Sequence, residues 1–282
     1  MRLGDGMVEP GRVEVERDVV FGTGGGRDLK CNVYRPPTSE ERLPGILLIH
    51  GGGWRSGDRN QLHGYGILLG RAGYVCVASE YRLVGESPWP AQIEDVKAAL
   101  RWMRANADAL HLDPDRIAVE GNSAGAHLAL FAAATQHDDR YEGSGGNPGV
   151  SSAVRAAIGV YTPTVFREEE KVRGSVPVQA ISDHPTPGLA QEVSPLHHLS
   201  AECPPVLLIH GTADTTVPVS ATMVAYDALR NLGVPVELHI YAEQAHAFDA
   251  DARFGRRCAD AMLFFLERYL LEAAATPAAV SG

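Results

Sequence analysis

Apolar residues along the chain gather in short runs rich in Val, Ile and Leu. Continuous runs of this kind are typical of strands that are buried on both faces of a parallel sheet. The runs that we expect to form such strands are 45–50, 74–78, 116–120, 155–160, 206–209 and 236–241. Two further β-rich stretches come first, at 13–21 and 29–34, and the glycines of GTGGGRD between them predict the turn of a hairpin.

Helical periodicity lies between these runs. The clearest stripe consists of Ile93, Val96, Leu100 and Met103. Their offsets of three, four and three place them on one face of an amphipathic helix that packs on a sheet. Pro90 stands at the start of this helix, where a missing N–H is tolerated. Helical sequence is also expected at 60–73, 124–135, 219–231 and 253–271.

Strands that alternate with helices predict an α/β fold. Right-handed crossovers between them give a mostly parallel sheet, here of eight strands, with helices on both faces. We expect a single domain over residues 1–272, with a cap-like insertion at about 161–205 and a disordered tail at 273–282. Ligands in such sheets bind at the carboxyl ends of the strands, so the residues after each apolar run are the ones to search for chemistry.

Charge and composition narrow the classes of function. The 282 residues include 35 Asp and Glu against 25 Lys and Arg, which gives a net charge of −10 and no basic cluster for nucleic acid. A hydrophobic content of 45% supplies a buried core and excludes wholesale disorder. No apolar run approaches the roughly 18 residues of a membrane span, and the first residues lack a hydrophobic signal core. We therefore expect a cytoplasmic protein with neither a nucleic-acid nor a membrane partner.

The four cysteines are scattered along the chain, at Cys31, Cys76, Cys203 and Cys258. None forms a CxxC pair, and four are too few for a disulfide framework, so we expect reduced thiols. The sequence has no HExxH motif and no cysteine and histidine cluster with ligand spacing, which predicts no metal. GTGGGRD lacks the GK[ST] ending of a phosphate loop, so no nucleotide cofactor is expected.

The pattern GxSxG follows the run at 116–120, in the letters GNSAG around Ser123. A serine in a sharp turn between a strand and a helix projects its hydroxyl above the sheet, and the flanking glycines leave room for neighbouring backbone. The helix N-terminus that follows favours developing negative charge. Ser123 is therefore the candidate nucleophile, and the alternative is a turn of small residues where a helix and a strand pack closely.

Three consecutive glycines follow the run at 45–50, in the letters HGGGW. Glycine loses much conformational entropy when it is ordered, so a triple glycine favours a backbone that approaches a ligand closely. An oxyanion is the obvious ligand, and the candidate donors are the amides of Gly52, Gly53 and Ala124. The Trp54 amide is a substitute because the register of such loops varies, and a flexible turn is the alternative interpretation.

An acid and a histidine follow the last two apolar runs. Asp214 comes shortly after 206–209, and His246 comes shortly after 236–241. With Ser123 they give the chain order serine, acid, histidine, which is associated with the α/β-hydrolase arrangement and not with other serine hydrolase folds. The histidine would accept the serine proton and return it to the leaving alcohol, while the aspartate fixes the imidazole tautomer and stabilises its charged form.

Other residues compete for these roles. The competing acids are Glu243, Asp249 and Asp183. Of the other histidines, His50 and His210 precede glycine turns and are expected to hold loop backbone by hydrogen bonds. His127 falls on the helix after Ser123 and is expected to be buried beneath the site.

These motifs resemble the α/β-hydrolase superfamily, and within it the carboxylesterases similar to hormone-sensitive lipase and to bacterial acetyl and feruloyl esterases. The resemblance covers roughly residues 12–271 and is carried by HGGGW, SEYRL, LDPDRIAVEGNSAGAHLAL, HGTADTTVPVS and AHAF. It implies a cofactor-independent serine esterase that works through an acyl-enzyme. In that case the triad is Ser123, Asp214 and His246, and the oxyanion hole is formed by Gly52, Gly53 and Ala124.

The chain departs from hormone-sensitive-lipase-like enzymes in one respect. We expect no long helical N-terminal cap of their kind within these residues, because β-like sequence begins near Val13. We expect the insertion at 161–205 to arch over the site instead, which is more similar to the feruloyl and acetyl esterases and to kynurenine formamidases. The aromatic residues that we expect either to line an acyl pocket or to belong to the core are Trp54, Tyr81, Trp89, Tyr161 and Phe166.

The sequence thus predicts a serine carboxylesterase for short-chain acetyl or butyryl esters, or for small aromatic esters of the feruloyl type. Its partner would be a small-molecule ester, and a homodimer is compatible with the sequence. The enzymatic alternatives are an arylformamidase similar to kynurenine formamidase and a small peptidase or amidase, since HGTADTTVP and AHAF also resemble prolyl oligopeptidases. The non-enzymatic alternative is a ligand receptor similar to plant gibberellin receptors, which lose the histidine that His246 supplies here.

Overall fold

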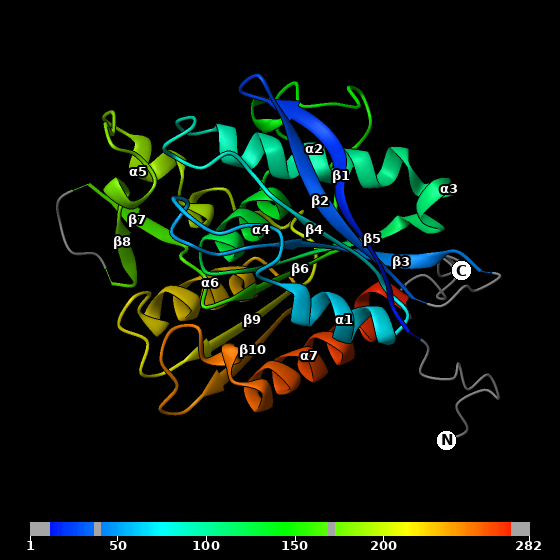
Figure 1. The fold of residues 1–282 in the computed structure, drawn as a ribbon. Helices are drawn as coiled ribbons and strands as arrows, with labels where there is room; N and C mark the ends of the chain where they lie inside the picture. Colours follow the sequence, from blue (N-terminus) through cyan, green and yellow to red (C-terminus); the bar gives the residue numbers. More distant parts are fainter. Residues whose placement is uncertain (1–11, 37–40, 169–172, 272–282) are drawn as a thin grey trace, which may run out of the picture.

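The apolar runs of the sequence pair into one eight-stranded sheet (Figure 1). The computed structural model describes residues 12–36, 41–168 and 173–271, so the predicted tail at 273–282 lies outside the described residues. The order of the strands across the sheet is β1-β2-β4-β3-β5-β6-β9-β10. Their bounds are β1 Glu14–Gly24, β2 Arg27–Arg35, β3 Leu43–Ile49, β4 Val75–Ser79, β5 Leu112–Asn122, β6 Ala156–Val160, β9 Val206–Gly211 and β10 Val236–Tyr241.

The sheet is antiparallel only at the edge formed by the leading hairpin. β1 pairs antiparallel with β2, and β2 pairs antiparallel with β4. Every other neighbouring pair among the described strands is parallel. The eight-stranded, mostly parallel sheet predicted from the sequence is therefore confirmed. Its carboxyl edge is where the residues after β3, β5, β6, β9 and β10 meet.

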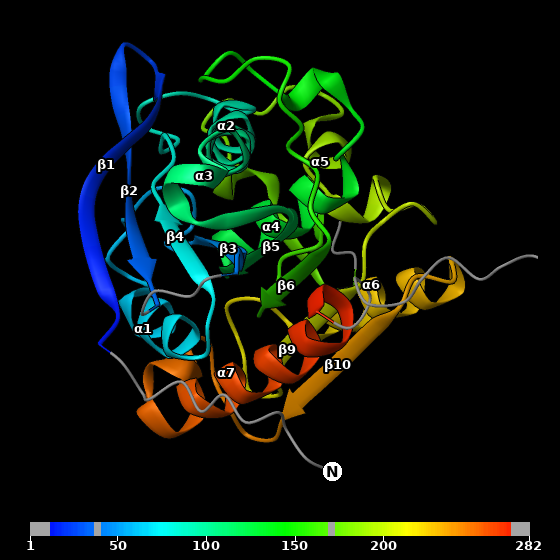
Figure 2. The same cartoon turned by 90° about the vertical axis from the view of Figure 1, so that its right-hand side faces the viewer.

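Helices cover both faces of the sheet (Figure 2). The helices on one face are α1 (His63–Arg71) and α7 (Ala252–Leu266), and those on the other are α2 (Ala91–Ala105), α3 (Ala107–Leu110), α4 (Ala124–Ala134) and α6 (Val219–Asn231). Strand β3 shows how one apolar run serves both layers. Leu47 and Ile49 pack with α2 and α4, whereas Ile46 and Leu48 pack with α1 and α7. Because side chains alternate along a strand, a continuous apolar run is needed to bury both faces.

Several elements differ in length from those predicted. The strand expected at 116–120 spans Leu112–Asn122, because Leu112 pairs with Leu43 and Asn122 pairs with Val160. The helix expected at 60–73 begins only at His63, since the preceding residues form turns bonded to Asp58. The last helix ends as an α-helix at Leu266 and continues in one π-helical turn.

The insertion at 161–205 carries secondary structure of its own (Figure 1). Its strands and helix are β7 (Val165–Arg167), β8 (Ser175–Pro177) and α5 (Leu189–Glu192), and β7 pairs with β8. Arg55, in the loop after β3, donates hydrogen bonds to the carbonyl oxygens of Gln179 at 2.9 Å and Ala180 at 3.3 Å. These contacts fasten the insertion to the glycine loop.

The four cysteines, which we expected to be reduced thiols, are free and buried. Burial raises the pKa of the Cys31 and Cys258 thiols to about 12, so both remain protonated. Within the described part of the chain, no helix combines the length and the apolar content that a bilayer crossing requires.

Two glycines of the GNSAG turn allow helix α4 to approach the sheet. A Cβ at Gly125 would lie 2.0 Å from the carbonyl oxygen of Ile49, and a Cβ at Gly121 would lie 2.3 Å from the backbone of Gly125. Side chains at these positions would collide with backbone, which cannot rotate away. The first turn of α4 therefore rests directly on the end of β3, beside the glycine loop.

We predict that Gly125→Ala destabilises the protein by about 1–3 kcal/mol, because overpacking forces the helix away from β3. Gly64→Ala is the matched control, since nothing lies within 4 Å of the Cβ position at Gly64 in α1. The control should leave stability unchanged or raise it by about 0.4–1 kcal/mol. Urea unfolding measures both, and equal stability of the two variants would contradict the packing argument.

Candidate active site

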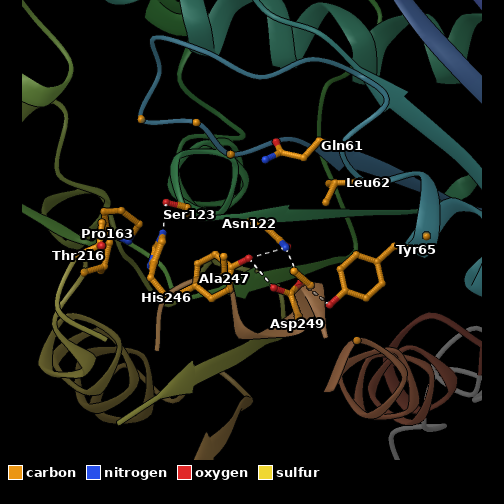
Figure 3. A pocket seen from close by; sticks show the side chains of 18 of the residues that line it. Gln61, Leu62, Tyr65, Asn122, Ser123, Pro163, Thr216, His246, Ala247 and Asp249 are labelled. Atoms are coloured by element: carbon orange, nitrogen blue, oxygen red, sulfur yellow. Dashed lines mark hydrogen bonds between the residues drawn. The ribbon is translucent and has the colours of Figure 1, made fainter. Parts of the chain in front are cut away.

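Ser123 occupies the turn between β5 and α4, at the carboxyl edge of the sheet (Figure 3). Its backbone has φ 54° and ψ −116°, a conformation that L-residues rarely adopt. The Ser123 N–H donates to the Val160 carbonyl at 2.9 Å, which holds the turn against the end of β6. Strain of this kind costs about 1–3 kcal/mol and persists only where the surrounding structure imposes it. The turn sets the hydroxyl at the wall of a cavity.

A row of three side chains begins at this hydroxyl. His246 Nε2 lies 3.0 Å from Ser123 Oγ, and His246 Nδ1 lies 2.7 Å from Asp214 Oδ2. The three residues follow β5, β9 and β10, so the sheet brings together groups that are remote in sequence. The Asp214 side chain is inaccessible to solvent, and the His246 side chain is 22% exposed. A hydroxyl, an imidazole and a carboxylate in this order allow a proton to pass from oxygen to nitrogen.

Asp214 is held in its charged form by several donors. Burial by itself would raise its pKa, but hydrogen bonds from His210 and His246 and from the Val217 N–H hold the pKa well below its usual range. Oδ1 accepts the N–H groups of Thr216 at 2.8 Å and Val217 at 2.9 Å. The carboxylate is thus fixed in position and charge.

His210 makes a contact that its position in the sequence does not reveal. We expected it to hold loop backbone, and its Nε2 lies 3.0 Å from the Val217 carbonyl. The same nitrogen also lies 3.2 Å from Asp214 Oδ2, while Nδ1 lies 2.6 Å from Thr222 Oγ1. Because both partners of Nε2 are acceptors, the proton sits on Nε2 and Nδ1 accepts from Thr222.

The glycine loop lies beside Ser123. A Cβ at Gly51 would lie 3.4 Å from the Ser123 Cβ, so the two segments are in contact. The loop turns back on itself because the Gly52 carbonyl accepts hydrogen bonds from the N–H groups of Arg55 and Ser56. The amides of Gly52, Gly53 and Ala124 donate to no other group that the structure describes. They remain available to a ligand at Ser123.

A buried histidine connects the glycine loop to α4. Trp54 Nε1 donates to His127 Nδ1 at 3.2 Å, and His127 Nε2 donates to the Val193 carbonyl at 2.7 Å. Burial lowers the pKa of His127 to about 4, so the ring is neutral and its tautomer is set by these two partners. The sequence placed His127 beneath the site, and the structure adds its bonds to the loop and to the insertion.

The cavity at Ser123 has a volume of about 970 Å³. Of the five aromatic residues predicted to line it, the structure brings Trp54 and Tyr161 to the wall. The other three, Tyr81, Trp89 and Phe166, do not line it and lie in the core around it, which is the second of the two places expected for these residues. Tyr81 is 1% exposed and stacks on His50 with ring centres 4.3 Å apart. Large aromatic side chains bury much apolar area, so core packing outweighs exposure.

Trp89 and Phe166 have partners of their own. Trp89 Nε1 donates to Glu192 Oε1 at 3.0 Å, in the insertion. Phe166 lies against the rings of Trp54 and His127, at 5.5 and 5.1 Å between ring centres. Both residues therefore support the wall of the cavity from behind.

The acids that competed with Asp214 are engaged elsewhere. Asp183 forms an ion pair with Arg55, and Glu243 is exposed. Asp249 lines the same cavity as Ser123 but hydrogen-bonds to Asn122, Tyr161 and Tyr65. Sequence reasoning weighed Asp249 only as a catalytic acid and missed this cluster, whose members come from four separate segments of the chain.

No group of three or more His, Cys, Asp or Glu side chains in the described ranges is placed to hold a metal ion.

The strained serine turn, the glycine loop and the hydrogen-bonded row occur together at the carboxyl edge of a mostly parallel sheet. This combination is the α/β-hydrolase fold. The comparison with protein-family models narrows the class, because the BD-FAE model matches residues 31–229 and the chain belongs to that family.

Named relatives and solved structures agree with this assignment. The chain is 34% identical to the probable carboxylic ester hydrolase LipM of Mycobacterium tuberculosis, over 89% of this chain and 60% of LipM. It is 32% identical to esterase LipQ of the same organism, over 88% of this chain and 61% of LipQ. The chain thus spans about three fifths of the length of these two relatives. It also resembles the structure of esterase Est2 of Thermogutta terrifontis, with a TM-score of 0.78 and 28% identity over 93% of this chain and 95% of Est2.

Glu120 is a buried acid near the site that does not belong to the hydrogen-bonded row of Ser123, His246 and Asp214. Glu120 lies on β5 three residues before Ser123 and is inaccessible to solvent. Neither oxygen of its carboxyl group has a hydrogen-bond partner among the described residues. Burial raises the pKa of Glu120 well above its usual value, and the nearby charge of Asp249 raises it further. The folded protein therefore binds a proton here that the unfolded chain releases.

We predict that Glu120→Gln gains stability relative to the wild type as the pH rises. In the unfolded chain the Glu120 carboxyl has a pKa of about 4.3. Above that pH the wild type must take up a proton when it folds, so its stability falls as the pH rises. The loss is at most about 1.4 kcal/mol per pH unit and ends at the pKa of the folded state. The variant lacks this dependence. Urea unfolding of both proteins between about pH 5 and pH 8 checks it, and a stability difference that does not change with pH would contradict a neutral Glu120.

Proposed function

We propose that the chain is a carboxylic ester hydrolase and that Ser123 is its nucleophile. The observation that carries this proposal is the row in which His246 lies 3.0 Å from the Ser123 hydroxyl and 2.7 Å from Asp214. The names of the relatives support it, since LipM and LipQ are described as an ester hydrolase and an esterase.

The first half of the reaction transfers the acyl group to the enzyme. Ser123 Oγ attacks the carbonyl carbon of the ester while its proton passes to His246 Nε2, and the carbonyl oxygen becomes an oxyanion. Asp214 stabilises the imidazolium through its bond to Nδ1. When the tetrahedral intermediate collapses, the carbon–oxygen bond to the alcohol breaks, and Nε2 returns the proton to the departing alkoxide.

The second half repeats these steps with water. His246 removes a proton from the water that attacks the acyl-enzyme, and the carboxylic acid then leaves as Ser123 recovers its proton. In both halves we assign the oxyanion to the amides of Gly52, Gly53 and Ala124. Their freedom from other hydrogen bonds supports this role, because an oxyanion donor must be available without prior rearrangement.

We propose that the acyl group is short-chain or small and aromatic. Structures of Thermogutta terrifontis Est2 with butyrate and with propionate bound, both 28% identical to this chain, support the short-chain class. Residues of the insertion, including Pro163, Val176 and Pro177, line the cavity and take up part of its space.

We predict that Ser123→Ala lowers the turnover of p-nitrophenyl butyrate by roughly 10⁴- to 10⁶-fold, because no acyl-enzyme can form. Wild-type protein should release a burst of nitrophenol and should gain one diethylphosphoryl group from paraoxon at Ser123. Ser151→Ala, an exposed serine away from the cavity, is the control and should behave as the wild type. Unchanged turnover in Ser123→Ala would reject the mechanism.

We expect kcat/KM to be higher for p-nitrophenyl acetate or butyrate, or for methyl ferulate, than for p-nitrophenyl decanoate, because the insertion limits the acyl space. Initial rates over a range of concentrations measure this order, with N-formylkynurenine and a proline anilide in parallel as amide substrates. A decanoate ester as the best substrate would contradict the acyl class. Faster turnover of either amide would contradict the preference for esters.

A further inference from the structure

The cavity extends past Ser123 into a part that the hydrolytic mechanism does not use. In Figure 3, Pro163 and Thr216 lie on one side of the Ser123 and His246 pair, and Leu62, Tyr65 and Asp249 lie on the other. We call this second part the α1–α7 lobe, because the segments that border it belong to or adjoin those two helices. The residues that define it are Leu62, Tyr65, Leu68, Ala247, Asp249 and Ala252. The six residues are apolar except for Tyr65 and Asp249, and Asp249 supplies the carboxylate.

Asp249 is the centre of a hydrogen-bonded cluster of neutral side chains. Oδ2 accepts from Tyr65 Oη at 2.8 Å and from Asn122 Nδ2 at 2.7 Å, and Oδ1 accepts from Tyr161 Oη at 2.7 Å. Asn122 Nδ2 also donates to Tyr161 Oη at 2.8 Å. Asn122 directly precedes Ser123, and the Asp249 carboxylate and the Ser123 hydroxyl border the same cavity.

Every donor of this cluster is already engaged, whereas acceptor capacity remains. A carboxylate offers about four lone-pair sites, and Asp249 receives three hydrogen bonds, so Oδ1 can accept another. Asn122 is 6% exposed, and its Oδ1 atom has no partner among the described residues. A polar ligand group that contacts Asp249 must therefore donate a hydrogen bond, as an amine or a hydroxyl does.

The charge in the lobe favours an amine. Asp249 is the only carboxylate among the described residues that line the cavity, and it forms no ion pair with any residue that the structure describes. Arg256 also lines the cavity, but it is exposed and makes no bond to Asp249. The nearby carboxyl of Glu120 is buried and its pKa is raised, so it adds no second negative charge beside the lobe. A carboxylate bordered by neutral donors and apolar walls attracts a cation.

We propose that the α1–α7 lobe binds a protonated amine carried by the ester substrate, with Asp249 as its partner. This substrate class rests on the proposed esterase function. The apolar walls contact the carbon chain that joins the amine to the ester. The amine belongs either to the acyl group or to the alcohol, and the experiment distinguishes the two sources.

Two series of esters test the proposal. The acyl series is p-nitrophenyl 6-aminohexanoate, 6-hydroxyhexanoate and heptanoate, and the alcohol series is 4-aminobutyl, 4-hydroxybutyl and pentyl butyrate. In the wild type we expect kcat/KM for the amine to exceed that of both other members at least tenfold in one series. A hydroxyl or methyl member that equals or exceeds the amine in both series would overturn the proposal.

The variant Asp249→Asn should reduce the amine-to-methyl ratio at least fivefold. The ratio corrects for any general loss of activity, because Asp249 also supports Asn122 beside Ser123. Asp251→Asn is the matched control, since it removes the same charge two residues later from an exposed position that does not line the cavity, and Asn also caps a helix well. If the amine-to-methyl ratio falls as far in Asp251→Asn as in Asp249→Asn, the assignment of Asp249 as the partner of the amine is overturned.

Turnover of the uncharged esters, which are the hydroxyl and methyl members of both series, tests the proposed esterase function separately. If the wild type hydrolyses none of them, the binding of hexylammonium and of 1-hexanol is measured by calorimetry. If hexylammonium binds more tightly than 1-hexanol and Asp249→Asn abolishes this difference, amine binding in the α1–α7 lobe is supported even though the esterase function fails. Equal or weaker binding of hexylammonium overturns it.

Discussion

The close approach of helix α4 to strand β3 governs the geometry of the candidate site. Because position 125 is glycine, the first turn of the helix rests on the backbone of Ile49. The chain between β5 and α4 must then reverse within very few residues, and Ser123 takes the strained conformation that results. The same contact sets the helix N-terminus beside the glycine loop at Gly51. A single packing contact thus places a hydroxyl and several free amides at one edge of the sheet.

Two carboxylates near this edge have opposite surroundings. Asp214 accepts hydrogen bonds from two backbone N–H groups and two imidazoles, and its side chain is closed to solvent. Its charge is directed at the ring of His246. Asp249 accepts only from neutral side chains and borders the cavity. The first carboxylate acts inside the protein, whereas the field of the second extends into the space where a small molecule would lie.

The sequence predicted the sheet well because continuous burial leaves a continuous apolar run, as in β3 and β9. It missed β7 and β8, since strands of three residues carry too little periodicity. The row of Ser123, Asp214 and His246 could be anticipated because each residue follows a strand of a parallel sheet. The Asp249 cluster could not, because its partners share no motif and meet only through tertiary packing. Aromatic side chains were equally ambiguous, since size alone does not separate a cavity wall from the core behind it.

The ring of His127 has a consequence for how small molecules reach Ser123. Its two nitrogens join Trp54 of the glycine loop to Val193 of the insertion. An outward swing of the insertion would leave a ring N–H without an acceptor in the interior, at a cost of about 1–3 kcal/mol. The same movement would take Phe166 away from the Trp54 ring, which packs against it with ring centres 5.5 Å apart. A small molecule that reaches Ser123 while the insertion stays in place therefore leaves both hydrogen bonds of His127 intact.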